Sequence, residues 1–196
     1  MRKNICLILI VFGYSIAHAQ NWTRSQLTKA NTASEIEYLT KVEKECILYI
    51  NLCRLYPKEF IKYEVLNYFG TEKYGDYLKN SQYRKSLIEY LQTLKSKEAL
   101  YFDIELFKNA SCFAEEQGIA GTTGHDRINC IKGNYAECCS YGMDTGKDIV
   151  MQLLIDHDVP SLGHRLICLS DSYSKIGVSI KPHIEWGTCA VINFIW

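Results

Sequence analysis

The C-terminal stretch KIGVSIKPHIEWGTCAVINFIW, residues 175–196, decides the fold class of this chain. In its first part Ile176, Val178 and Ile180 alternate with small or charged residues, which is typical of a β-strand. From Cys189 to Trp196 the sequence is almost continuously apolar, as expected for a strand covered on both faces. We therefore predict two strands in this stretch.

The residues before these strands carry helical patterns. Ser34 is a suitable N-cap, and apolar residues recur at steps of three and four up to Leu55, where Pro57 follows closely. Asp103 is a suitable cap for a later helix. Residues 135–141 fit either a short strand or an extended loop. Helices are predicted at about 34–55, 57–68, 83–94, 103–117 and from 146 to before Pro160.

Helices first and strands last predict an α+β fold, in which helices pack on one small, mainly antiparallel sheet. We see no internal repeat and no domain linker, so residues 34–196 are expected to form a single domain. Residues 20–33 are polar and are expected to form a flexible N-terminal arm.

The first nineteen residues have the features of a signal peptide. Arg2 and Lys3 are followed by an apolar run from Ile5 to Ile16 and by small residues at a cleavage position near Ala19-Gln20. The alternative is an uncleaved anchor, but twelve apolar residues are short of the about 20 that span a bilayer. No later stretch is long and apolar enough to do so. We expect a secreted protein, either periplasmic or extracellular.

Charge and cysteine content limit the function classes. Lys+Arg and Asp+Glu are balanced at 22 each, which argues against nucleic acid as a partner. Eight cysteines follow the signal peptide, and in an exported chain they suggest disulfides that brace the C-terminal half. Cys46 and Cys53 would lie about 10 Å apart along one helix, so they should not pair with each other. Several of the eight are alternatively buried free thiols.

Three polar positions in the C-terminal half indicate where a site lies. His125 follows a glycine, His164 follows another, and Glu137 stands between them in an apolar, cysteine-rich stretch. Imidazole and carboxylate groups are the minimum for a divalent metal site or for acid–base chemistry. A carboxylate among apolar neighbours also needs a partner, and one of these histidines is expected to be that partner.

The order of these motifs resembles the CAP superfamily of cysteine-rich secretory proteins, venom allergens and plant pathogenesis-related proteins, in particular its bacterial-type SCP domain. The resemblance covers roughly residues 43–196. It rests on Leu100-x-x-Asp103-x-x-Leu106, Gly124-His125, Glu137 followed by Tyr141-Gly142, Gly163-His164-Arg165, and Ile176-Gly177-Val178.

The resemblance implies an α-β-α sandwich with a cleft lined by two histidines and two acids, which in many members can hold a divalent metal. His125, Glu137 and His164 match family positions, whereas the second acid has no clean match and could be Asp156 or Asp158. The family's Gly-Glu-Asn motif reads Ala-Glu-Cys here. Cleft residues expected on this basis are His125, Glu137, Asp156, His164 and Arg165, and the expected metal ligands are His125 and His164.

Three functions are compatible with these features. The first is a secreted binding or interaction module without turnover, which the resemblance favours and whose ligand would be a small molecule, a lipid, a glycan or another extracellular protein. The second is a zinc-dependent hydrolase in which His125 and His164 hold zinc and Glu137 acts as general base. The third is a disulfide-braced structural protein with no site. A serine or cysteine nucleophile is less favoured, since no Gly-x-Ser-x-Gly motif is present.

Overall fold

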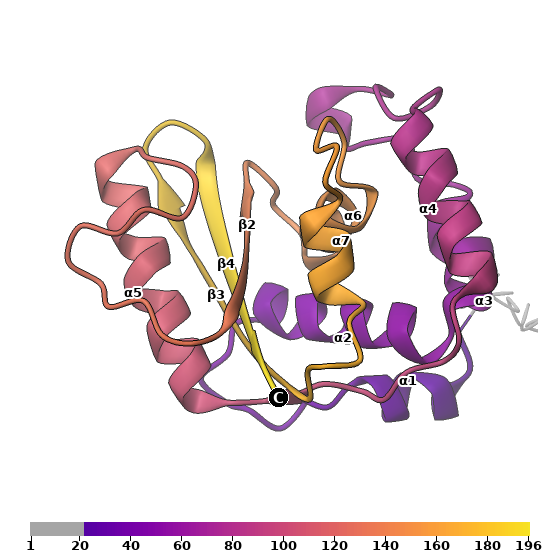
Figure 1. Ribbon diagram of the computed structural model, residues 1–196, viewed down its shortest axis with the longest axis horizontal. Coiled ribbons are helices and arrows are strands. Elements are labelled where there is room, and N and C mark those ends of the chain that lie inside the picture. The colour runs from indigo at the N-terminus through magenta and orange to yellow at the C-terminus, as the bar shows by residue number, and fades with distance from the viewer. Residues whose placement is uncertain (1–21) are drawn as a thin grey trace, which may run out of the picture.

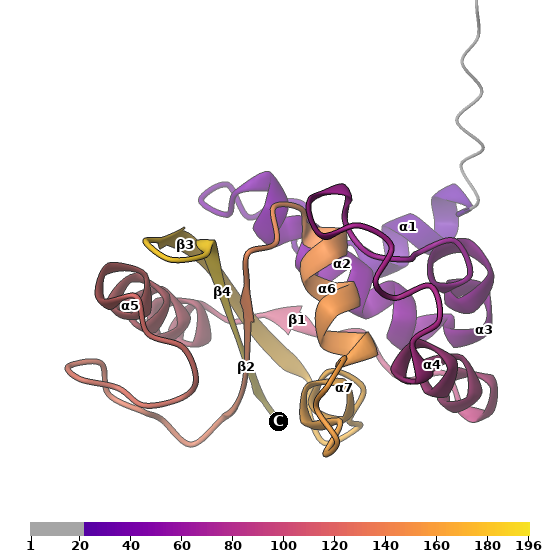
Figure 2. The same ribbon diagram turned by 90° about the horizontal axis from the view of Figure 1, so that it is seen from above.

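The computed structural model describes residues 22–196, so the predicted signal peptide lies outside the described part of the chain. In this part helices cover both faces of a four-stranded sheet (Figures 1 and 2). The sheet order is β1-β3-β4-β2, with β1 parallel to β3 and the other neighbours antiparallel. The strands are β1 (Tyr101–Phe102), β2 (Ala136–Tyr141), β3 (Lys175–His183) and β4 (Gly187–Ile195). The predicted α+β fold with a small, mainly antiparallel sheet is confirmed.

The two faces of β4 belong to two different apolar cores. Ile192 and Phe194 join the main core, whereas Cys189 and Val191 pack with Phe113 of helix α5 (Ile104–Ala120). This arrangement explains why β4 is apolar at nearly every position, because alternate side chains point to opposite faces. Helix α5 approaches β3 closely at Gly177, where an added Cβ would lie 2.3 Å from the backbone nitrogen of Phe107.

The opposite face of the sheet is covered by helices from both halves of the chain. Helix α2 (Lys41–Leu55) packs on β3, and α6 (Gly146–Ile155) and α7 (Gly163–Cys168) pack on β2 (Figure 2). Among the helices of residues 22–196, none has the length and apolar character needed to cross a membrane. The remaining helical segments are α1 (Arg24–Ala30), α3 (Pro57–Phe60), a π-helical turn (Ile61–Val65), a 3-10 turn (Glu72–Tyr74) and α4 (Gln82–Thr93).

Two predictions about the N-terminal region were wrong. The expected flexible arm contains helix α1, which has a capping box at Thr23, and the indole of Trp22 is buried and donates to Glu64 at 2.6 Å. The first long helix begins at Lys41 and not near residue 34. Thr40 and Glu43 form a capping box there, in which each side chain accepts from the other residue's backbone N–H. A reciprocal cap satisfies two backbone donors, whereas a single serine cap satisfies one.

Other local predictions agree with the structure. Helix α2 ends at Leu55, and Asp103 caps α5 by accepting from the backbone N–H groups of Glu105 and Leu106. Residues 136–141 form strand β2, which settles the choice between strand and loop. Among the described residues one disulfide joins Cys112 to Cys130, and the other six cysteines are buried free thiols.

Candidate functional site

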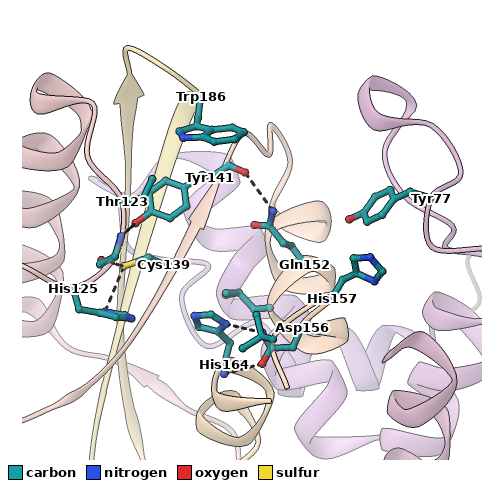
Figure 3. Close-up of a pocket in the computed structure, with 13 residues that line it drawn as sticks. Tyr77, Thr123, His125, Cys139, Tyr141, Gln152, Asp156, His157, His164 and Trp186 are labelled. Atoms are coloured by element: carbon teal, nitrogen blue, oxygen red, sulfur yellow. Dashed lines mark hydrogen bonds and ion pairs between the residues drawn. The ribbon is translucent and has the colours of Figure 1, made fainter. Parts of the chain in front are cut away.

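A cavity of about 560 Å³ opens beside β2, which is an outer strand of the sheet. One wall is the loop after α5, which carries His125, and the other wall consists of α6, α7 and the turn between them (Figure 3). Tyr77 and Trp186 lie at its periphery. The cavity therefore joins segments that are far apart in the sequence. Its polar lining includes His125, Cys139, Tyr141, Gln152, Asp156 and His164.

The first histidine–carboxylate pair is His125 with Glu137. Nδ1 of His125 lies 3.0 Å from Oε1 of Glu137, so the carboxylate has the histidine partner that its apolar neighbours predicted. The Glu137 side chain is only 3% exposed, whereas that of His125 is 46% exposed. Glu137 is absent from the cavity lining and lies behind the imidazole. Its role in this arrangement is to orient His125, since a ring nitrogen fixed by a carboxylate leaves the other nitrogen for a ligand.

Arg127 is a site residue that the sequence patterns did not single out. Its guanidinium donates to both oxygens of Glu137, with one contact at 3.3 Å and a second, shorter one. The guanidinium also stacks on Phe113, 3.9 Å from the ring centroid, and donates to the hydroxyl of Tyr135. A buried carboxylate requires such compensation. The sequence places this arginine two residues after His125, but its partner Glu137 lies on strand β2, so the pairing could not be recognised from neighbouring residues.

The second pair is His164 with Asp156. Nδ1 of His164 lies 2.7 Å from Oδ1 of Asp156, and the other oxygen accepts from the backbone N–H groups of His164 and Arg165. Asp156 ends helix α6 with a φ of 56°, and this left-handed turn directs the chain back toward α7. Of the two acids left open by the sequence, Asp156 is the one in the cavity. Asp158 is exposed and contacts His157 instead.

Arg165 does not line the cavity, although the sequence predicted that it would. Its guanidinium is buried and donates to the carbonyl oxygens of Leu154, Ile155 and Tyr83 at 2.7 to 3.0 Å. Burial lowers the pKa of Arg165, and the Asp156 carboxylate opposes that shift. Because its buried guanidinium donates to α6 and also to Tyr83 and Ser86 of α4, Arg165 ties these helices together beneath the site and does not face a ligand in the cavity.

The loop that carries His125 is fastened at several points. The Cys112–Cys130 disulfide joins it to α5, and the carboxylate of Glu116 accepts from three backbone N–H groups of residues 128–130. Burial alone would raise the pKa of Glu116, but these donors outweigh it and lower the pKa. Closer to the cavity, the backbone N–H of Gly124 donates to the Tyr141 hydroxyl at 2.9 Å.

His183 has a structural role. Its Nε2 contacts the carbonyl of Thr122 at 2.9 Å, and its Nδ1 accepts from the backbone N–H groups of Glu185 and Trp186. These contacts require a proton on Nε2 and none on Nδ1. The ring therefore connects the β3–β4 turn to the loop before His125.

The ligand atoms that cluster in the described residues are those of His125, Glu137 and Cys139, which lie within 4.8 Å of one another. His164, the second ligand that the sequence predicted, does not belong to this group of the described residues, and its Nδ1 contacts Asp156. The donor types of this group would suit zinc. However, the Arg127 guanidinium already occupies Glu137 and would repel a second cation. Burial, with the Glu137 charge, also raises the pKa of the Cys139 thiol, which disfavours a thiolate ligand.

Comparisons with known proteins identify no family. No protein-family model matches the chain, and no curated protein matches it. Among solved structures it is similar to an outer surface protein from Borrelia burgdorferi, with 19% sequence identity and a TM-score of 0.42. The match covers 56% of this chain and 86% of that one. A likeness at this level says nothing about the activity of the present chain.

Proposed function

We propose that this protein is a secreted, CAP-like binding module that holds its ligand in the cavity beside β2 without turning it over. The observation that carries the proposal is the convergence of two histidine–carboxylate pairs, from different elements, on one cavity. Cavities lined by apolar surface with a few fixed polar groups are typical of ligand sites. The motif order in the sequence, with Asp156 as the second acid, supports the CAP-like assignment.

Export is supported by two features. The sequence of residues 1–19 has the pattern of a signal peptide, and the Cys112–Cys130 disulfide suits an oxidising compartment. The partner is accordingly a small molecule, lipid, glycan or polypeptide met outside the cytoplasm.

Binding is favoured over catalysis by the state of the two carboxylates. A general base must reach the proton that it removes, but Glu137 is buried behind His125 and is held by Arg127. Asp156 accepts from two backbone N–H groups and from His164. Both carboxylates are thus committed to orienting imidazoles.

The alternative is the zinc-dependent hydrolase with His125 and His164 as ligands and Glu137 as general base. The close approach of ligand atoms from His125, Glu137 and Cys139 is the observation in its favour. The Arg127–Glu137 ion pair weighs against it, because removing that guanidinium would leave a buried carboxylate without its main counter-charge.

The proposal is tested by a fragment screen with NMR detection on three proteins. The wild type is compared with Thr123→Trp, which places an indole at the exposed cavity wall, and with Ile131→Trp, which places one on an exposed part of the same loop outside the cavity. Fragments should shift the signals of His125 and His164 in the wild type and in Ile131→Trp, but not in Thr123→Trp. Equal binding to all three proteins, or no binding to any, would refute a ligand site in this cavity.

A further inference from the structure

Two residues on the free edge of β2, Cys139 and Tyr141, line the cavity. The backbone N–H of Gly142 donates to the carbonyl of Thr188 at 3.0 Å, so this pair continues the β2–β4 ladder. Residues of an antiparallel strand bond to the neighbouring strand alternately. The N–H and C=O groups of Glu137, Cys139 and Tyr141 therefore point away from β4, toward the side on which α6 and α7 form the far wall.

One of these outward groups is already bound by an amide that resembles a peptide. The side-chain nitrogen of Gln152 donates to the carbonyl of Tyr141 at 3.3 Å, as the N–H of a further strand would (Figure 3). At Cys139, two residues earlier, no described residue supplies a partner to the outward N–H or C=O, and Cys139 lines the cavity. This position therefore presents one backbone donor and one backbone acceptor to a ligand in the cavity, and such groups are normally paired once water is displaced from them.

We propose that the ligand of the cavity is an extended peptide segment, which adds a strand to the free edge of β2 and exchanges backbone hydrogen bonds with Cys139. This inference rests on the proposed binding function and specifies its ligand class. Strand addition to an exposed sheet edge is a general mode of peptide recognition, in which backbone bonds supply affinity and pockets for alternate side chains supply specificity.

The side chains of an added strand would alternate between two faces, and the cavity has a wall on each side to receive them. Side chains on one face would meet the wall of His125, and those on the other face would meet the wall of Asp156 and His164. The part of the edge that lines the cavity, from Cys139 to Tyr141, extends about 7 Å at 3.3 Å per residue, so a peptide of about five residues would cover it and continue along β2 toward Glu137. The cavity volume of about 560 Å³ is consistent with a short segment of that kind.

The test uses a mixture of capped pentapeptides with all residues except cysteine at each position, added to the full mature protein. Binding is followed by NMR, and hydrogen exchange is measured at the amides of Cys139 and Tyr141. We expect members with Kd between micromolar and about 1 mM, and slower exchange at these two amides when they are bound. The best binder is then made in two N-methylated forms, one at residues 2 and 4 and the other at residues 1, 3 and 5.

Only one of the two forms should lose binding, by about tenfold or more, because alternate amides of an added strand face β2. Cys139→Pro should cause the same loss, because proline lacks the backbone N–H that would donate to the peptide. Proline is tolerated where the N–H faces away from the ladder, and unchanged NMR signals of β4 would show that the variant folds. Equal binding of both methylated forms, unprotected amides, or no binding peptide at all would overturn the inference. If fragments still bind the cavity in those cases, the binding function stands and only the peptide ligand is refuted.

Discussion

Removing the Cys112–Cys130 disulfide tests whether it is a main stabiliser of this fold. The bridge spans 18 residues of sequence, so the restriction it places on the unfolded chain corresponds to about 3 kcal/mol at 25 °C. For a domain of this size each kcal/mol changes Tm by about 2 to 4 °C. The double variant Cys112→Ser/Cys130→Ser should therefore melt about 6 to 12 °C below the wild type.

The two single variants provide the control. Each of them removes the same bridge, so each should match the double variant instead of contributing half of its effect. Thermal unfolding at neutral pH, followed by circular dichroism, measures all three against the wild type. A loss of stability of less than about 1 kcal/mol in the double variant, or losses in the two single variants that sum to that of the double variant, would refute the reasoning from loop closure.

The same bridge holds the loop that carries His125, which adds a local consequence. Glu116 still binds the backbone of residues 128–130 in the double variant, so the loop should stay attached to α5 but exchange its amide hydrogens faster. Hydrogen exchange of the loop amides, with those of β4 as the internal reference, measures this effect. Equal acceleration in the loop and in β4 would mean that the disulfide acts only on global stability.

Three further predictions concern the site. Arg127→Ala should destabilise the protein by about 3 to 5 kcal/mol in chemical denaturation, because it leaves the buried Glu137 carboxylate without its counter-charge. Adding Glu137→Gln, which removes that charge, should recover part of the lost stability. Calorimetric titration with zinc should give indistinguishable weak binding for the wild type and for His125→Ala/His164→Ala, whereas tight binding lost in the variant would favour the zinc hydrolase. The Cys139 thiol should react slowly with a thiol reagent at neutral pH although it lines the cavity, since burial and the Glu137 charge raise its pKa and the thiolate is the reactive form. Its labelling rate should rise with pH up to the limit of native stability, and rapid labelling at pH 7 would contradict the assigned environment.

The local patterns of the sequence were sufficient for the fold class and for naming candidate site residues. Alternation in residues 176–180 and the apolar run of β4 predicted two strands, and the periodicity of apolar residues predicted α2 and α5. Such patterns report which face of an element is buried, which is a property of neighbours along the chain. For the same reason, the Gly-His pairs and the lone Glu137 could be recognised as candidate site residues from their local surroundings in the sequence.

Only the tertiary structure decided how these residues are partnered. Asp156 rather than Asp158 faces His164 because a left-handed turn ends α6 at that residue, and Arg127 reaches Glu137 because the loop after α5 is fastened over β2. Arg165 turned inward, because the carbonyl groups of Leu154 and Ile155 at the C-terminal end of α6 lack intrahelical donors and the guanidinium supplies them. These outcomes depend on contacts between segments distant in the sequence, and periodicity carries no information about them. The sequence by itself determined the longer helices and the two C-terminal strands, and packing determined which of the polar residues face the cavity.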